Sequence, residues 1–139
     1  MQLSVVSGTP DKFTGFGLRV LVVGCEPSLV RYFCRFLRLY GYQVDKAFSA
    51  SNAFRKSEAH PPDIAIVMTL MPEISGFDIG EYVSRQSQCG VIFVTAMDLD
   101  NPVLKENLCG LQVEGCKCEA LPLPFENSDL LAMLQRLGS

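Results

Sequence analysis

The strongest constraint on the fold comes from short apolar runs in which apolar and polar residues do not alternate. Ile64–Met68 and Val91–Thr95 are apolar at nearly every position, and Leu18–Val23 is a further apolar, β-branched run. A strand with one face in water alternates, whereas a strand without alternation is covered on both faces, as in a parallel sheet between layers of helices. The sequence therefore predicts an α/β fold.

Segments with helical periodicity separate these runs. The first helix is predicted to start at Glu26-Pro27-Ser28, where a proline is tolerated in the first turn, and to stop at Gly41. Its apolar face is predicted to consist of Leu29, Tyr32, Phe33, Phe36, Leu37 and Tyr40. Its opposite face carries Arg31, Arg35 and Arg38, which we interpret as a solvated stripe or, as a hypothesis, a site for an acidic partner.

The remaining elements continue the same order. Further helices are predicted at Ala50–Ala59, Phe77–Arg85, Val103–Leu108 and Ser128–Leu137, and further strands at Gln43–Ala47 and Cys118–Leu121. Successive βα units of this kind predict a doubly wound, five-stranded parallel sheet with helices on both faces. Ligands of such folds bind beyond the carboxyl ends of the strands. In this chain those ends are Gly24-Cys25-Glu26, Met68-Thr69, Thr95-Ala96 and Leu121–Pro124.

Several spaced motifs resemble one family. They are Leu21-Val22-Val23 with Glu26-Pro27, Gly41-Tyr42 with Val44, Pro62-Asp63, Met71-Pro72-Glu73 with Gly76-Phe77, Val94-Thr95-Ala96 and Pro124-Phe125. Residues 18–139 resemble the receiver domains of two-component response regulators, which have a flavodoxin-like fold. Residues 1–17 are then interpreted as a flexible N-terminal arm in which residues 3–6 are a candidate edge strand.

The resemblance implies a phosphorylation site whose groups have been replaced. Receivers hold Mg²⁺ with two adjacent acids after the first strand, and they accept phosphate on an Asp that ends the third. They also carry a Thr or Ser after the fourth strand and a Lys before the proline that follows the fifth. The corresponding residues here are Gly24 and Cys25, Met68, Thr95 and Leu123, so that Thr95 alone keeps its chemistry.

Elementary chemistry leads to the same prediction. Mg²⁺ requires hard oxygen ligands, which Gly24, Cys25 and Met68 lack, and Glu26 alone would bind it weakly. A thioether cannot form an acyl phosphate, and Leu123 cannot balance the charge of a phosphoryl group. We therefore predict a pseudo-receiver with no catalytic residue, metal or cofactor, in which Met68 and Leu123 fill the old pocket and Thr95 is structural.

The predicted function is signalling through protein contacts rather than catalysis. The domain would be the regulatory module of an atypical response regulator or a stand-alone adaptor, with a protein partner or a second copy bound through its last two helices. The residues predicted for that surface are Val103, Leu104, Leu131 and Met133, whereas Leu130, Leu134 and Leu137 are predicted to face the sheet. The alternative is a redox, metal or small-molecule sensor that uses the degenerate pocket and the cysteines.

Six cysteines are many for a domain of this size: Cys25, Cys34, Cys89, Cys109, Cys116 and Cys118. The Cys116-x-Cys118 pair has no second pair or nearby His to complete a zinc site. We interpret the cysteines as small apolar filler in a reducing compartment. The alternative is a thiol switch in which Cys25 and Cys118 both lie at the old phosphorylation pocket.

Composition limits the remaining classes. The chain of 139 residues is long enough for one domain with its own core, and its net charge of −3 argues against general nucleic-acid binding. No membrane span or signal peptide is recognisable, which predicts a cytoplasmic location. The single histidine, His60, is predicted to be solvated at a helix end. The peptide bond before Pro124 is predicted to be cis, as the resemblance implies.

Overall fold

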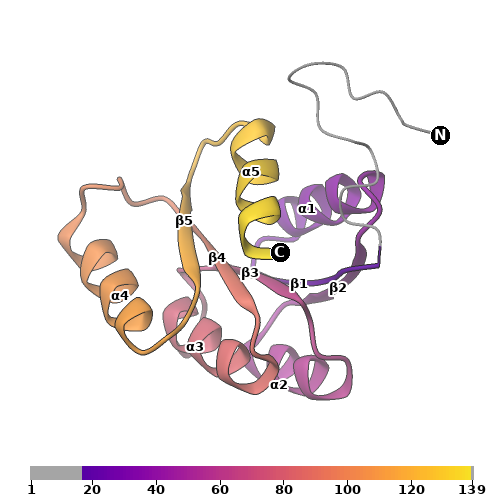
Figure 1. Ribbon diagram of the computed structural model, residues 1–139, viewed down its shortest axis with the longest axis horizontal. Helices are drawn as coiled ribbons and strands as arrows, with labels where there is room; N and C mark the ends of the chain where they lie inside the picture. Colours follow the sequence, from indigo (N-terminus) through magenta and orange to yellow (C-terminus); the bar gives the residue numbers. More distant parts are fainter. Residues whose placement is uncertain (1–16, 139) are drawn as a thin grey trace.

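The computed structural model describes residues 17–138 and has the predicted architecture (Figure 1). One parallel sheet has the strand order β2-β1-β3-β4-β5. The strands are β1 (Arg19–Val23), β2 (Gln43–Ala47), β3 (Ile64–Met68), β4 (Gly90–Thr95) and β5 (Cys118–Pro122). The predicted arm, apart from residue 17, and the candidate edge strand lie outside the described residues.

Five helices connect or follow these strands. They are α1 (Pro27–Leu39), α2 (Ala50–Ala59), α3 (Gly76–Ser87), α4 (Pro102–Val113) and α5 (Asn127–Gly138). Helix α4 runs beyond the predicted end at Leu108, through Gly110 to Val113. Gly115, which has a positive φ of 96°, follows the C-cap residue Glu114 and ends the helix. Within the described residues, no helix is long and apolar enough to cross a membrane.

The strand order determines which helices share a face. The connection from β1 to β2 runs in one direction across the sheet, and the connections from β2 through β5 run in the other. Because such crossovers are right-handed, α1 lies on one face and α2, α3 and α4 lie on the other. Helix α5 lies beside α1, and Figure 1 shows the two helices on the same side of the sheet. All residues of β3 and β4 are buried, as the apolar runs predict.

An aromatic cluster joins α1 to the segment that leads into α5. The rings of Phe33 and Phe125 stack with their centroids 5.4 Å apart, and Tyr32 meets Phe125 edge-on at 6.1 Å. The prediction that Tyr32 is buried is wrong, because 42% of it is exposed. Its hydroxyl donates a hydrogen bond to the Asn127 side chain at the start of α5, so the ring lies at the rim of the core.

The first residue of α3 lies unusually close to the end of β3. A Cβ atom on Gly76 would be 1.9 Å from the carbonyl oxygen of Met68, and the Gly76 N–H donates to the Thr69 carbonyl over 2.9 Å. The obstacle is backbone, so it cannot rotate away as a side chain can. Glycine at this position fixes α3 against the carboxyl end of β3.

We predict that Gly76→Ala lowers the free energy of unfolding by about 1–3 kcal/mol or more, because overpacking against backbone forces the helix start to move. The matched control is Gly110→Ala in the exposed part of α4, where an added Cβ meets nothing within 4 Å. That substitution should stabilise the protein by up to about 1 kcal/mol through helix propensity. Urea denaturation of both variants measures the difference in their free energies of unfolding. Equal effects would contradict the close contact between Gly76 and the end of β3.

Candidate functional site

The carboxyl edge of the sheet brings the predicted site residues together. Gly24 follows β1, Met68 ends β3, Thr95 ends β4 and Leu123 follows β5. The Thr69 N–H donates to the Val94 carbonyl (2.9 Å), and the Leu123 N–H donates to the Thr95 carbonyl (2.8 Å). These bonds continue the backbone hydrogen bonding of the sheet beyond the ends of the strands and hold the loops of the site side by side.

The side chain of Met68 lies against the bare Cα of Gly24. A Cβ atom on Gly24 would be 2.1 Å from the Met68 Sδ and 3.0 Å from a methyl group of Val30. Met68 is only 6% exposed. Its thioether therefore occupies the space that any side chain at position 24 would enter.

The two residues after Gly24 are engaged elsewhere. The exposed Cys25 thiol contacts the Leu70 carbonyl oxygen at 3.6 Å. The Glu26 carboxylate accepts hydrogen bonds from the Ser28 hydroxyl (3.0 Å) and the Ser28 N–H (3.4 Å) and so caps the N-terminus of α1. The carboxylate nearest to Gly24 in the sequence thus serves a helix end.

This donor set does not fit a magnesium ion. Gly24, Cys25, Glu26 and Met68 together offer a thioether, a thiol and one carboxylate that already accepts two hydrogen bonds. Mg²⁺ requires octahedral oxygen coordination. Among residues 17–138, no group of three or more His, Cys, Asp or Glu side chains is placed to hold a metal. No step of a mechanism is assigned to a metal at this edge.

Thr95 and Leu123 differ in their surroundings. Thr95 is buried, and its hydroxyl oxygen accepts a hydrogen bond from the Met97 N–H at 3.0 Å, which is a local backbone contact of the predicted kind. Leu123 does not fill the pocket as predicted, because it is 37% exposed in the loop after β5 while Met68 occupies the interior. The Leu123–Pro124 peptide bond is cis, as predicted.

Comparison with known proteins is consistent with this geometry. Residues 20–116 match the family model of the response regulator receiver domain. The chain belongs to the response regulator receiver domain family. As a receiver domain, it is a signalling module of two-component systems.

Curated relatives support the same conclusion. The heme response regulator HssR of Staphylococcus saprophyticus is 31% identical over 111 residues, which are 80% of this chain and 47% of that protein. The probable transcriptional regulatory protein TcrX of Mycobacterium tuberculosis is 28% identical over 127 residues, which are 89% of this chain and 53% of that protein. The matched part therefore spans only about half the length of these two relatives.

Solved receiver structures share the fold. The chemotaxis protein CheY4 of Vibrio cholerae superposes with a TM-score of 0.75 at 27% identity, covering 86% of this chain and 98% of that one. The receiver domain of the Pseudomonas aeruginosa sensor histidine kinase PA1611, solved with magnesium coordinated in its active-site cleft, has a TM-score of 0.72 at 25% identity. That comparison covers 88% of this chain and 99% of that one.

Two predicted surface residues of the receiver domain are in its core. Leu104 is fully buried, and Leu131 is 4% exposed, so neither can form an exposed interaction surface. Val103 is 56% exposed, and Met133 is partly buried against the core. Helix α5 is apolar on more than one side because it packs over β3, β4 and β5, and Leu131 joins Leu130, Leu134 and Leu137 in that contact.

One further hypothesis places a cysteine at the wrong end of the sheet. Cys118 begins β5 and Asp63 precedes β3, so both lie at the amino edge, away from Cys25 and Met68. The hypothesis of a thiol pair between Cys25 and Cys118 is therefore wrong. Asp63 accepts a hydrogen bond from the Arg19 N–H (2.8 Å) and belongs to the strand starts. His60, at the end of α2, is exposed as predicted.

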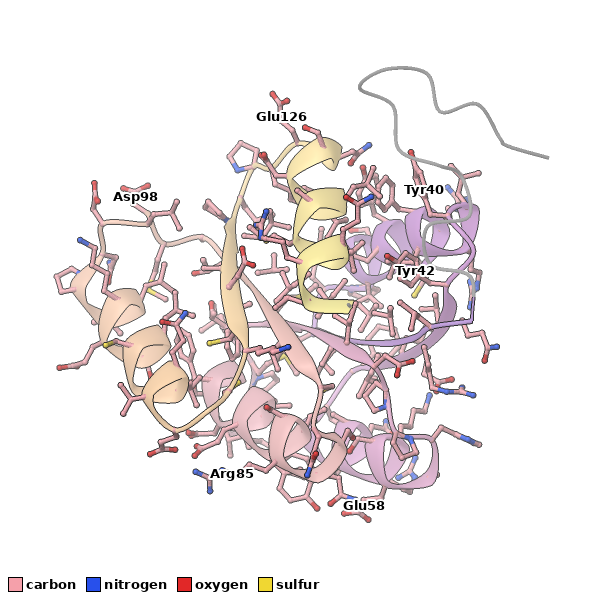
Figure 2. The ribbon with its side chains drawn as sticks, viewed as in Figure 1. Tyr40, Tyr42, Glu58, Arg85, Asp98 and Glu126 are labelled. Atoms are coloured by element: carbon pink, nitrogen blue, oxygen red, sulfur yellow. The ribbon has the colours of Figure 1, made fainter. Side chains whose placement is uncertain are left out.

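The sequence did not indicate a second concave site at the amino edge. A cavity of about 600 Å³ lies there, and its walls include Ser84 and Arg85 of α3 together with Cys89 and Cys116. These residues are close because β4 and β5 are neighbours, although Cys89 and Cys116 are far apart in the chain. Figure 2 shows the two edges through their labelled residues, with Asp98 beyond the carboxyl end of β4 and Arg85 at the opposite edge.

The contact between Met68 and Gly24 predicts strong coupling between the two positions. Gly24→Ala should destabilise the receiver domain, because the new methyl group displaces the buried thioether. In the background of Met68→Ala the same change should cost much less, with a coupling free energy of about 0.5–3 kcal/mol. A double-mutant cycle measured by urea denaturation tests this, and additive effects would contradict the contact.

Proposed function

We propose that this receiver domain signals without aspartyl phosphorylation, as the regulatory module of a larger regulator or as an adaptor. The single observation that carries the proposal is the buried Met68 side chain, which ends β3 and fills the space beside Gly24. A thioether can neither accept a phosphoryl group as an acyl phosphate nor bind a hard cation. On this proposal the domain is not an enzyme, and its output depends on the surfaces it presents.

The relatives support the proposal that this domain is a module of a larger regulator, and the cysteines support a cytoplasmic location. HssR is named a response regulator and TcrX a probable transcriptional regulator, and both are about twice as long as the matched segment, which fits a module of a larger regulator. Cys34, Cys89 and Cys118 are buried and unpaired, which fits the reducing conditions of the cytoplasm.

The phosphorylation test uses the intact protein with acetyl phosphate and with beryllofluoride, each with Mg²⁺. We expect no increase in mass and no Mg²⁺-dependent spectral change, because carboxylate acceptor, metal ligands and counter-charge are replaced together. Met68→Asp alone should not restore either response, and it should lower the free energy of unfolding by about 1–3 kcal/mol, since the new carboxylate is buried without a cation. An acyl phosphate on the unmodified chain would contradict the proposal.

Restoration should require several changes made in combination. Gly24→Asp is blocked by the Met68 thioether and becomes tolerable only with Met68→Asp, whereas Leu123→Lys should be tolerated alone because Leu123 is at the surface. We expect beryllofluoride binding only when Gly24→Asp, Cys25→Asp, Met68→Asp and Leu123→Lys are combined, since the groups act as a unit. The variant with all changes except Leu123→Lys is the matched control.

We further propose that the output surface is the face of α4, β5 and α5, occupied by a second copy of the chain. A groove of about 300 Å³ on this face is lined by apolar residues that include Leu99, Phe125, Ala132 and Met133. Leu99 is exposed within this groove, and Val103 is exposed on α4. The face also carries both signs of charge, because Arg136 pairs with Glu119 (2.5 Å) and Lys105 with Asp100 (3.9 Å). Two copies related by a twofold axis can therefore meet there without net like-charge repulsion.

Val103→Glu should dissociate the dimer and leave the monomer folded, because Val103 is exposed in the monomer. The control is Leu39→Glu at the end of α1, which is similarly exposed but lies on the face of the sheet opposite α4. Sedimentation equilibrium measures the association of both variants and of the wild type. A wild type that is monomeric at high concentration would contradict the dimer, and association with an unrelated protein through Val103 would favour a heterologous partner in its place.

A further inference from the structure

Helix α1 carries its arginines in one row on the side turned away from the core. Arg31, Arg35 and Arg38 are spaced by four and three residues, which places them within an arc of about 60° on a helix with 3.6 residues per turn. All three are exposed. The other side of the helix is packed into the core through its buried residues, which are Val30, Phe33, Cys34, Phe36 and Leu37. The core contacts therefore fix the orientation of the row.

No acid neutralises this row within residues 17–138. The ion pairs of that part of the chain engage Arg19, Arg85, Lys105 and Arg136, and none of them involves an arginine of α1. The helix itself contains no Asp or Glu, and the carboxylate of Glu26 in front of it caps the first turn. Like charges four residues apart destabilise a helix. The row therefore carries a repulsion that an acidic partner would relieve.

Lys46 of the neighbouring strand β2 extends the positive surface. Its side chain is exposed. Burial raises the pKa of the Cys34 thiol on α1, and the charges of Arg38 and Lys46 oppose this rise, so both cations act near the same part of the helix. The adjacent Asp45 is engaged elsewhere, because it pairs with Arg19 at 3.6 Å.

Two exposed apolar side chains border the row of arginines. Leu39 is 58% exposed and Tyr32 is 42% exposed, and the helical repeat places both on the same flank of the row. Tyr32 is held in place, because its ring stacks on Phe36 with centroids 6.3 Å apart and its hydroxyl donates to the Asn127 side chain. Tyr and Arg are residue types that protein–protein interfaces favour over the rest of the surface.

The charge of the whole domain is unevenly divided. Residues 17–62, which form β1, α1, β2 and α2, hold seven Lys and Arg against three Asp and Glu, whereas residues 63–138 hold four against eleven. Figure 2 shows Tyr40, at the end of α1, and Asp98 on opposite sides of the domain. A long polyanion or an anionic membrane would be repelled by the second part, whereas a short acidic segment can contact α1 alone.

We propose that the outer face of α1, with Lys46 beside it, binds an acidic, amphipathic segment of a partner protein. Each guanidinium can donate paired hydrogen bonds to a carboxylate, and an acidic helix with the same spacing of side chains matches the row along α1. Apolar residues of that segment would contact Tyr32 and Leu39. The proposed dimer uses other residues, so this inference does not rest on the proposed function.

The first experiment titrates the intact, ¹⁵N-labelled protein with a synthetic helical peptide. The peptide carries three Glu spaced by four and three residues with Leu at neighbouring positions, and its control has Gln in place of each Glu. We expect saturable NMR shift changes at Arg31, Arg35, Arg38 and Lys46, binding at least about tenfold weaker for the control, and weaker binding at high salt. Equal binding of both peptides, no saturable change, or changes confined to other elements would overturn the proposal.

The second experiment compares two charge reversals that alter the net charge equally. Arg35→Glu should weaken binding of the acidic peptide by about fivefold or more, because it places a carboxylate in the middle of the row. The matched control is Arg55→Glu on α2, which is also exposed but lies on the other face of the sheet, and it should change the affinity by less than about twofold. Equal weakening by both would show that only net charge is sensed and would overturn the site.

Further variants separate geometry from charge and from folding. Arg35→Lys keeps the charge but loses the paired hydrogen bonds, so we expect binding between that of the wild type and that of Arg35→Glu. Arg38→Glu should repeat the loss at a second position of the row. The NMR spectrum of each free variant reports whether it is folded, and weak binding by a folded Arg38→Glu together with Arg35→Glu supports the row as the binding site.

The last arm tests other polyanions with the same variants. Duplex DNA of arbitrary sequence, followed by fluorescence anisotropy, and phosphatidylserine vesicles, followed by co-sedimentation, should bind more weakly than the acidic peptide. Tighter binding of either one that Arg35→Glu abolishes would overturn the protein partner and assign the row to a polyanion. Val103→Glu should leave peptide binding unchanged, so failure of the dimer and failure of this site give different results.

Discussion

The contact of the Met68 thioether with the bare Cα of Gly24 is the constraint on which the interpretation of the carboxyl edge depends. In a phosphorylatable receiver, the space between these two positions holds acidic groups whose mutual repulsion a bound metal ion offsets. Here a flexible apolar side chain fills it, and burial of its methyl and methylene groups contributes about 0.8 kcal/mol for each carbon. Gly24 and Met68 fit together because glycine leaves room for the methionine side chain. An acid at position 24 would in turn meet a thioether, which cannot bind a hard cation with it.

The loops around this edge keep the receiver geometry although their chemistry has changed. Gly76 still packs against the end of β3, Thr95 still bonds local backbone, and the bond before Pro124 is cis. Backbone contacts position these loops, so the scaffold does not need the ion. The proposed loss of phosphorylation is therefore compatible with a stable domain, whose outer surfaces remain available for signalling.

Most of the fold could be predicted because its signals are local. The uninterrupted apolar runs of β3 and β4 identified buried parallel strands, and Gly41 marked a helix end correctly. The failures involve information that single elements do not carry. Helical periodicity could not show that Leu104 and Leu131 are buried, because α4 and α5 are apolar on more than one side. The proximity of Cys89 and Cys116 depends on strand order and register, and the exposure of Leu123 depends on how the loop after β5 lies on the folded domain.

The two edges of the sheet illustrate how one scaffold can separate two kinds of chemistry. At the carboxyl edge, the buried Met68 side chain packs against Gly24, where the family resemblance implies ionic groups. At the amino edge, thiols line a cavity, and burial raises the pKa of Cys89 to about 12. Helix α4 contacts this second group of residues through Leu108 and Gln112 and presents Val103 to solvent at its other end. Cys118 is thus joined to a surface helix by direct contacts.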